Sequence, residues 1–184
     1  MRCCFVLVEI NNILVFMSDK TILLNEGQIQ AKINRIVHQI HELCFTEKEV
    51  IICGITPGNG STLAHRVSNK LESISSIRIK RTEIEINKES PLSNKIKCTL
   101  KSEEYANKTI IIVDDVSNSG KTLMYAAKYF LESPIKAIRP LVLVDRNHSV
   151  YPIKPSFVGI TVSTTLQDHI HVEMNEEKEA VYLV

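Results

Sequence analysis

The feature that most constrains this chain is an uninterrupted apolar run, Thr109 to Val113, that leads directly into an acidic pair and a loop of small residues. β-Branched residues without polar alternation are typical of a strand that is covered on both faces. The residues from Leu123 to Leu131 then follow a helical pattern, and Ala137 to Val144 predict the next strand. This βαβ spacing predicts a parallel α/β sheet, in which ligands bind where strands end and helices begin.

The preceding residues predict further helices and strands of the same sheet. Asn25 begins an amphipathic helix with a capping box, and a strand over residues 49–54 leads through the loop ITPGNG to a second helix capped by Ser61. Residues 77–86 predict one or two half-exposed strands, and residues 88–108 predict a mobile loop or an irregular hairpin. The residues expected to face inward are Ile29, Ile33, Ile36, Ile40 and Leu43 in the first helix and Leu63, Val67 and Leu71 in the second.

Length and composition fit a single domain. The chain has 184 residues, of which 44% are hydrophobic, enough to bury a sizeable core. Its net charge of +1 excludes a protein that binds nucleic acid or anionic membranes by overall charge alone. The five cysteines never form a C-x-x-C pair and are odd in number, so they indicate neither a disulfide framework nor a zinc ribbon. We therefore expect a reducing, cytoplasmic location.

The first sixteen residues form the longest apolar stretch of the chain. Polar residues at Glu9, Asn11 and Asn12 interrupt it, and no small-residue cleavage site follows, which argues against a signal peptide or a membrane span. Met17 opens a sequence more usual for a cytosolic protein. Residues 1–16 are thus either a misassigned upstream start or an extra strand, and residues 17–184 are the predicted domain.

The acidic pair and the loop after it suggest a phosphate-containing ligand. Backbone N–H groups at a helix start, a glycine and hydroxyl side chains form a site for a phosphate monoester, while Asp114 and Asp115 suit the hydroxyls of the same ligand. An acidic strand end in a nucleotide hydrolase and a simple helix cap are the alternatives. A nucleotide-binding P-loop is disfavoured, because Asp115 stands where its first glycine is required. The predicted phosphate-binding residues are Ser117, Asn118, Ser119, Gly120, Lys121 and Thr122.

Two groups of histidines were considered as metal ligands. Along the first helix, Cys44 is rotated well away from His38 and His41, so the three do not form a ligand face. His169 and His171 share one face of a predicted strand without a third ligand. The sequence predicts no protein-held metal.

The segment IIIVDDVSNSGKT resembles the phosphoribosyl-pyrophosphate signature of the type I phosphoribosyltransferases. LVLVDRNHSVYPIKPSFVGITVSTT is similar to the C-terminal half of the bacterial pyrimidine-operon regulators called PyrR, which are also uracil phosphoribosyltransferases. ILLNEGQIQAKINRIVHQIHE resembles that family's first helix, IICGITPGNGSTLAHRV lies where its pyrophosphate loop lies, and DHIHVEM with AVYLV fits its closing strands. The resemblance implies a mainly parallel central sheet, flanking helices and a small flexible hood.

The resemblance also implies an activity and its residues. Phosphoribose would be transferred from phosphoribosyl pyrophosphate to a nucleobase, with uracil as the expected base and UMP and pyrophosphate as products. Mg²⁺ would be held mainly by the substrate, and the protein would form a homodimer. Asp114 and Asp115 would orient the ribose and stabilise the positive charge of the transition state. Pyrophosphate would lie on Thr56, Pro57, Gly58, Asn59 and Gly60, and the base on Val162, Ser163 and Thr164, with Asp145 and Arg146 behind it.

This sequence departs from the family pattern at three places. The loop over residues 54–61 lacks the basic residue that normally follows a threonine, which predicts weaker stabilisation of the leaving pyrophosphate. The Thr56–Pro57 bond within it is expected to be trans, with cis as the alternative. In the flexible loop, IEINKES replaces an Arg-Asp-Asp group, so Lys88 could supply the missing cation beside Glu89.

The third departure concerns RNA. Part of the basic face that binds RNA in regulatory relatives persists, but Ser149 and Ile160 fall where basic residues are common. A weakly catalytic or non-catalytic UMP-sensing, RNA-binding regulator is therefore the alternative function. The residues that persist are Arg35, His38, His148 and Lys154.

Overall fold

The computed structural model describes residues 9–10, 13–14, 20–165, 167–175 and 178–184. Near the N-terminus, β1 (Glu9–Ile10) and β2 (Ile13–Leu14) pair with each other in an antiparallel ladder. Met1 and Met17 lie outside the described residues, so the assignment of the start and of a domain over residues 17–184 stays a prediction.

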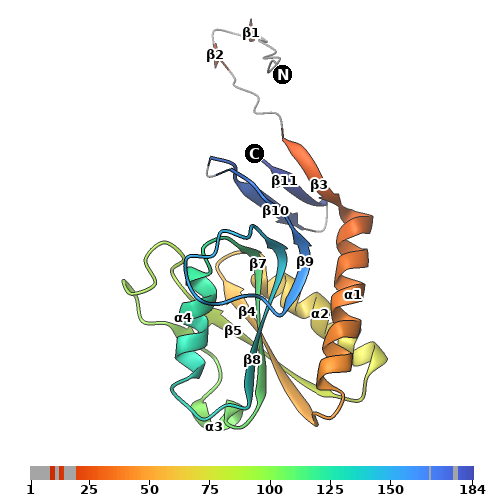
Figure 1. Ribbon diagram of the computed structural model, residues 1–184, viewed down its shortest axis with the longest axis vertical. Helices are drawn as coiled ribbons and strands as arrows, with labels where there is room; N and C mark the ends of the chain where they lie inside the picture. Colours follow the sequence, from red (N-terminus) through yellow and green to blue (C-terminus); the bar gives the residue numbers. More distant parts are fainter. Residues whose placement is uncertain (1–8, 11–12, 15–19, 166, 176–177) are drawn as a thin grey trace.

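A six-stranded sheet forms the centre of the molecule (Figure 1). Its members pair in parallel, except that β6 is antiparallel to β5 at one edge. This is the mainly parallel α/β sheet that the sequence predicts. The strands in sheet order are β6 (Lys97–Cys98), β5 (Arg78–Glu85), β4 (Glu49–Thr56), β7 (Thr109–Ser117), β8 (Ala137–Asp145) and β9 (Phe157–Thr161).

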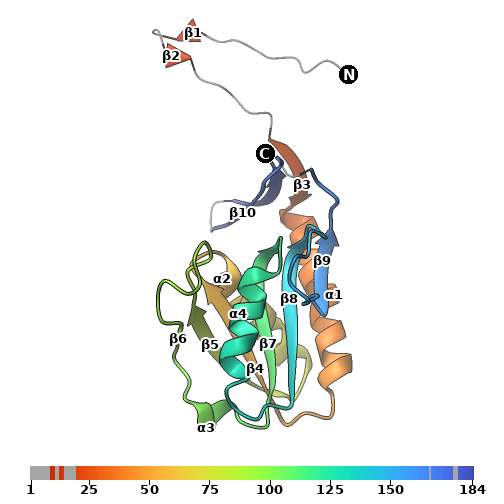
Figure 2. The same cartoon turned by 60° about the vertical axis from the view of Figure 1, so that its left-hand side comes forward.

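Helices cover both faces of this sheet (Figures 1 and 2). α1 (Glu26–Cys44) and α2 (Gly60–Ile74) pack on one face of the sheet, and α4 (Lys121–Phe130) packs on the other. The short α3 (Ser102–Tyr105) lies on the same face as α4. Each face therefore has its own apolar core, and the central strands are buried between the two. The burial of both faces explains the continuous apolar run in β7.

A second, three-stranded antiparallel sheet lies beyond the carboxyl ends of the main strands (Figure 1). β10 (Ile170–Met174) pairs with β11 (Glu179–Leu183), and β11 pairs with β3 (Thr21–Asn25). Residues from both ends of the described chain thus build the small hood that the family resemblance implies.

The first helix is close to its prediction. Asn25 and Gln28 form the expected capping box, and the predicted isoleucines are buried. Leu43 is the exception: it is 49% exposed, because the helix turns Cys44 inward at its last turn.

Several boundaries differ from the sequence predictions. α2 begins at Gly60 with Asn59 as its N-cap residue, because the hydroxyl of Ser61 donates to Glu83 instead of capping the helix. The region 77–86 contains one strand, β5 (Arg78–Glu85), and the region 88–108 forms an irregular hairpin through β6. The Thr56–Pro57 bond is cis, the isomer that we considered the less expected one.

Glycines permit the close approach between β4 and α2. A Cβ atom on Gly60 would lie 2.5 Å from the carbonyl oxygen of Ile55 and 2.7 Å from that of Val113. The turn therefore packs backbone against backbone beside the end of β7. Within the described part of the chain, no helix is long and apolar enough to cross a membrane.

Candidate active site

The acidic pair lies within β7, not after it. The strand continues through the polar residues to Ser117, and Asp114 still pairs with Val142 of β8. Backbone pairing is independent of side-chain polarity, so the ladder continues where the apolar pattern stops. The side chain of Asp114 is only 2% exposed and that of Asp115 is 14% exposed.

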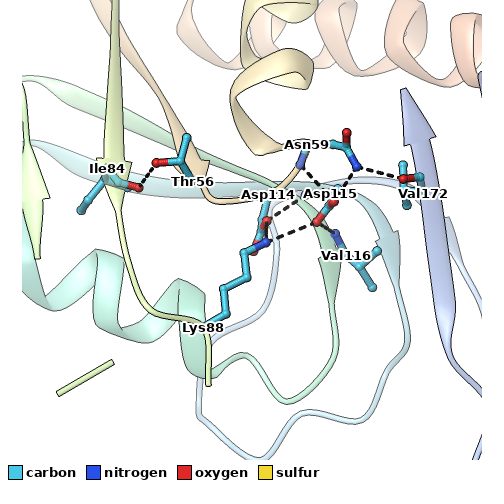
Figure 3. A network of polar contacts seen from close by, with 8 residues as sticks. All are labelled: Thr56, Asn59, Ile84, Lys88, Asp114, Asp115, Val116 and Val172. Atoms are coloured by element: carbon cyan, nitrogen blue, oxygen red, sulfur yellow. Dashed lines mark hydrogen bonds and ion pairs between the residues drawn. The ribbon is translucent and has the colours of Figure 1, made fainter. Parts of the chain in front are cut away.

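Lys88 neutralises this pair (Figure 3). It follows β5 in the chain, and its Nζ lies 2.8 Å from Asp114 Oδ1 and 3.5 Å from Asp115 Oδ1. On the other side, the backbone N–H and the side-chain amide of Asn59 both donate to Asp115 Oδ2, at 3.2 and 3.1 Å. The same amide donates to the carbonyl oxygen of Val172 in β10 at 2.9 Å, which ties the hood to the acidic pair.

The two carboxyl groups differ in their electrostatics. Burial raises the pKa of Asp114 to about 7, although the nearby Lys88 ammonium acts to lower it. Burial also acts to raise the pKa of Asp115, but Lys88 and the hydrogen bonds from Asp114 and Asn59 outweigh it, so that pKa is lowered. For Lys88 itself, burial acts to lower the pKa, yet the two carboxylates raise it. The site thus keeps one firmly ionised carboxylate and one whose charge changes near neutral pH.

The predicted phosphate-binding residues lie beside this pair. All six of them, residues 117–122, line a cavity of about 510 Å³ together with Asp114 and Asp115. Gly120 has a φ of 78°, a left-handed conformation that favours glycine, and it leads directly into α4. The Oγ atom of Ser117 is buried and has no hydrogen-bond partner among the described residues. A helix start and an unpaired hydroxyl beside two carboxylates can hold a ligand that carries both a phosphate and hydroxyl groups.

Two of the five residues predicted for pyrophosphate line cavities, and each lines a different one. Asn59 lines the 510 Å³ cavity, whereas Pro57 lines a neighbouring cavity of about 750 Å³. Thr56 donates its hydroxyl to the carbonyl oxygen of Ile84 at 3.4 Å. Gly58 has a φ of 120° and lies close to the Lys88 ammonium. Gly60 is buried at the start of α2.

Of the residues predicted for the base, only Arg146 lines the cavity. Its side chain organises the turn that follows β9, donating to the Thr164 hydroxyl at 3.0 Å and to the carbonyl oxygens of Thr165 and Asp168 at 3.0 and 2.8 Å. Val162 donates its N–H to the carbonyl oxygen of Asp145. The structure therefore gathers Asp145, Val162 and Thr164 around Arg146, outside the cavity lining, and Ser163 is exposed on the same turn.

The sequence predictions missed one wall of the cavity. β10 and the residue before it supply His169, Ile170, His171 and Val172 to the lining. Alternating histidines on one strand face were noticed only as candidate metal ligands, and nothing in the local pattern indicates that this strand folds over β7. Lys88 was recognised as a cation near the site, but its contact with the acidic pair was not predicted.

The chain is similar to known proteins over most of its length. Residues 20–177 match the phosphoribosyl transferase domain. The bifunctional protein PyrR of Staphylococcus epidermidis is 32% identical over 170 residues, which cover 87% of this chain and 94% of that protein. The chain belongs to the PyrR-like phosphoribosyltransferases. Another relative of the same name, from Leuconostoc citreum, is 32% identical over 180 residues, 91% of this chain and 99% of its own length.

Solved structures show the phosphoribosyltransferase fold as well. A hypoxanthine phosphoribosyltransferase from Trypanosoma cruzi superimposes with a TM-score of 0.67 at 13% identity, covering 89% of this chain and 95% of that one. A hypoxanthine-guanine phosphoribosyltransferase from Bacillus anthracis gives 0.63 at 20% identity, covering 79% and 84% of the two chains. At these identities the likeness concerns the fold alone.

As a phosphoribosyltransferase site, the cavity offers few ligands to a metal. Among the residues that the structure describes, no group of three or more His, Cys, Asp or Glu side chains could hold a metal ion. The acidic pair still presents carboxylate oxygens, the ligand type that Mg²⁺ prefers. The residues present therefore fit Mg²⁺ as carboxylate ligands.

The residues predicted for RNA lie on α1 and in the segment between β8 and β9. Arg35 on α1 donates to the carbonyl oxygens of Val158 and Gly159 in β9, at 2.7 and 2.8 Å, so its guanidinium already has partners. His38 and Lys154 are exposed, and His148 is half-buried.

Proposed function

We propose that this protein transfers phosphoribose from phosphoribosyl pyrophosphate to uracil and releases UMP and pyrophosphate. The observation that carries the proposal is the single cavity shared by Asp114, Asp115 and the phosphate-binding residues 117–122. A sugar phosphate needs both halves at once, because its phosphate and its hydroxyl groups are joined by one short chain of atoms.

Binding begins with the 5-phosphate. The backbone N–H groups at the start of α4 and the unpaired Ser117 hydroxyl are the donors for it. Gly120 lets the backbone approach the phosphate closely. With the phosphate held there, the ribose hydroxyls lie toward Asp114 and Asp115.

The acidic pair then stabilises the positive charge that develops on the ribose. Breaking the bond to pyrophosphate leaves positive charge on the ribose, and a preorganised carboxylate stabilises that charge without having to reorient. Asp115 is suited to this role, because Asn59 fixes it through two hydrogen bonds and keeps it ionised. The carboxylate oxygens of Asp114 and Asp115 would help to hold Mg²⁺ that arrives with the substrate, and the ion would supply positive charge for the leaving group.

Base selection is proposed for the turn that Arg146 organises. Asp145, Val162, Ser163 and Thr164 lie on or beside this turn. Backbone groups of residues 162–164 would donate to and accept from the edge of a pyrimidine, while β10 would close the cavity from the other side.

Formation of UMP from uracil, phosphoribosyl pyrophosphate and Mg²⁺ tests the proposal. Asp115→Asn keeps the shape of the side chain and removes its charge, and we expect the rate to fall by about 100-fold to 1,000-fold. Glu103→Gln removes an exposed carboxylate on α3 that lines neither cavity, and as the comparison variant it should leave the rate unchanged. The proposal fails if neither uracil nor any other pyrimidine or purine base reacts with the wild-type protein.

A second candidate is a UMP-sensing regulator that binds RNA and catalyses weakly or not at all. The pyrophosphate loop without a basic residue favours it, since a poor leaving-group site lowers the rate without preventing UMP binding. UMP-dependent binding to a pyrimidine-operon leader RNA would support it, with Arg35, His38, His148 and Lys154 as candidate contacts. Absence of binding even at low salt, where phosphate contacts are strongest, would contradict it.

The setting proposed for either function is the cytoplasm, with the protein as a homodimer. Cys44 and Cys53 have free, buried thiols, which is in keeping with a reducing compartment. Sedimentation of the purified protein would measure its oligomeric state.

A further inference from the structure

Lys88 occupies the position in which the acidic pair would receive its ligand. Its ammonium lies 2.8 Å from Asp114 Oδ1 and within reach of Asp115. Ribose hydroxyls or a substrate-borne cation need those same oxygens. The ion pair and a bound ribose are therefore mutually exclusive at Asp114, and Lys88 has to leave when the substrate enters.

The surroundings of Lys88 offer a second position for its ammonium group. Its side chain is 32% exposed and lines both the 510 Å³ cavity and the neighbouring 750 Å³ cavity. Its ammonium lies against the turn at Gly58, where an added Cβ atom would be 2.9 Å from Nζ. The Lys88 ammonium thus lies beside both the turn at Gly58 and the acidic pair, and Figure 3 shows its contacts with the pair.

That loop needs a cation. Residues 54–61 contain no lysine or arginine, although a pyrophosphate group carries several negative charges. With the 5-phosphate on residues 117–122, a pyrophosphate on the ribose lies on the far side of the acidic pair, where Asn59 and Lys88 are found. A buried ion pair separates readily only when each partner finds a replacement, and pyrophosphate is such a replacement for Lys88.

We propose that Lys88 is an exchangeable cation that pairs with Asp114 and Asp115 in the free protein and transfers to the pyrophosphate group when substrate binds. It thereby supplies from the β5–β6 hairpin the charge that the pyrophosphate loop lacks. Ligand binding is thereby coupled to the separation of Lys88 from the acidic pair. This inference rests on the proposed function for the identity of the ligand.

The exchange predicts an effect on ligand affinity that would not be expected if Lys88 had only a structural role. Lys88 competes with a ribose for the acidic pair but assists a pyrophosphate. In Lys88→Ala, affinity for magnesium pyrophosphate should fall by about 10-fold to 100-fold. Affinity for UMP, which has a ribose and a 5-phosphate but no pyrophosphate, should stay within about threefold or increase.

Titration calorimetry with these two ligands measures both effects. Lys88→Gln can still donate to Asp114 and is measured beside Lys88→Ala in case the unpaired carboxylates impair folding; the same loss of pyrophosphate affinity is expected. Lys97→Ala is the matched control, because Lys97 lines the second cavity from the same hairpin and pairs with exposed Glu85 at 3.4 Å. It should leave both affinities unchanged.

Rescue provides an independent arm. Pro57→Arg in the Lys88→Ala background puts a basic residue on the loop itself, and we expect most of the pyrophosphate affinity to return. Parallel losses of pyrophosphate and UMP affinity in Lys88→Ala would overturn the exchange and indicate a structural role. Unchanged pyrophosphate affinity, or a wild-type protein that does not bind pyrophosphate, would also overturn it. Tight pyrophosphate binding without UMP formation would instead count against the proposed activity alone.

Discussion

Single residues in this site combine burial with charge. Asp114 is almost fully enclosed, yet its carboxyl group has one cationic partner, Lys88, and accepts the backbone N–H of Asp115 at 3.0 Å. Asp115 has more donors and keeps its charge more readily. Neighbouring carboxyl groups of identical chemistry thus acquire different proton affinities from their surroundings.

The raised pKa of Asp114 predicts a pH dependence of stability. The pKa is about 7 in the folded protein against an ordinary value of 3.8, so the folded state binds this proton more tightly than the unfolded state does. The Asp114 contribution is favourable at low pH and is lost as pH rises between those values, with a limiting slope of about 1.4 kcal/mol per pH unit. Asp114→Asn should remove this slope, which urea unfolding of both proteins at pH 5 and pH 7.5 measures. An equal change in both proteins would contradict the prediction.

Gly120 makes a second prediction at this scale. Its φ of 78° and the 3.0 Å distance from an added Cβ to Ile153 Cγ2 leave no relaxed position for a side chain. Gly120→Ala should cost about 1–2 kcal/mol of stability and weaken UMP binding, because residues 117–122 would shift. Gly27→Ala is the control, since its added Cβ has only an ordinary contact at 3.6 Å from Asn25 Oδ1. Denaturant unfolding and UMP titration of both variants separate the two effects, and equal behaviour would refute the prediction.

At the scale of elements, the sequence predicted those features that depend on residues close together in the chain. The capping box of α1 and the order of strands and helices could be predicted from residues close together in sequence, and so could the acidic pair with its phosphate loop. The polar end of β7 could not, because its ladder to β8 is made by backbone groups that the side-chain pattern does not report. Lys88 and β10 reach the site by tertiary packing, which leaves no periodic signal near either segment.

The contact between the hood and the main body leads to a further prediction about stability. Arg66 on α2 donates to Glu179 of β11 at 2.6 Å and to Gln30 of α1 at 2.9 Å. Arg66→Ala should cost about 1–3 kcal/mol, since it leaves a partly buried carboxylate without its cation, and should speed amide exchange in β10 and β11. The exposed pair of Arg81 with Glu72 is the control, and Arg81→Ala should change stability by less than about 1 kcal/mol. Unaltered exchange in the hood of Arg66→Ala would contradict this.

At the scale of the whole molecule, the net charge of +1 bears on the two candidate functions. A phosphoribosyl ligand is recognised by a few groups inside one cavity and needs no overall charge. An RNA partner would depend on a continuous basic face, and Arg35 is already engaged with β9. The distribution of charge therefore favours small-molecule recognition as the main task of this chain.

The pairing of β3 with β11 also bears on how the protein is made. These strands come from opposite ends of the described chain, and β10, which closes the cavity, is held only through β11 in the small sheet. A nascent chain that has left the ribosome only as far as β9 can assemble the main sheet but not this wall. The cavity is therefore complete only after synthesis has passed β11.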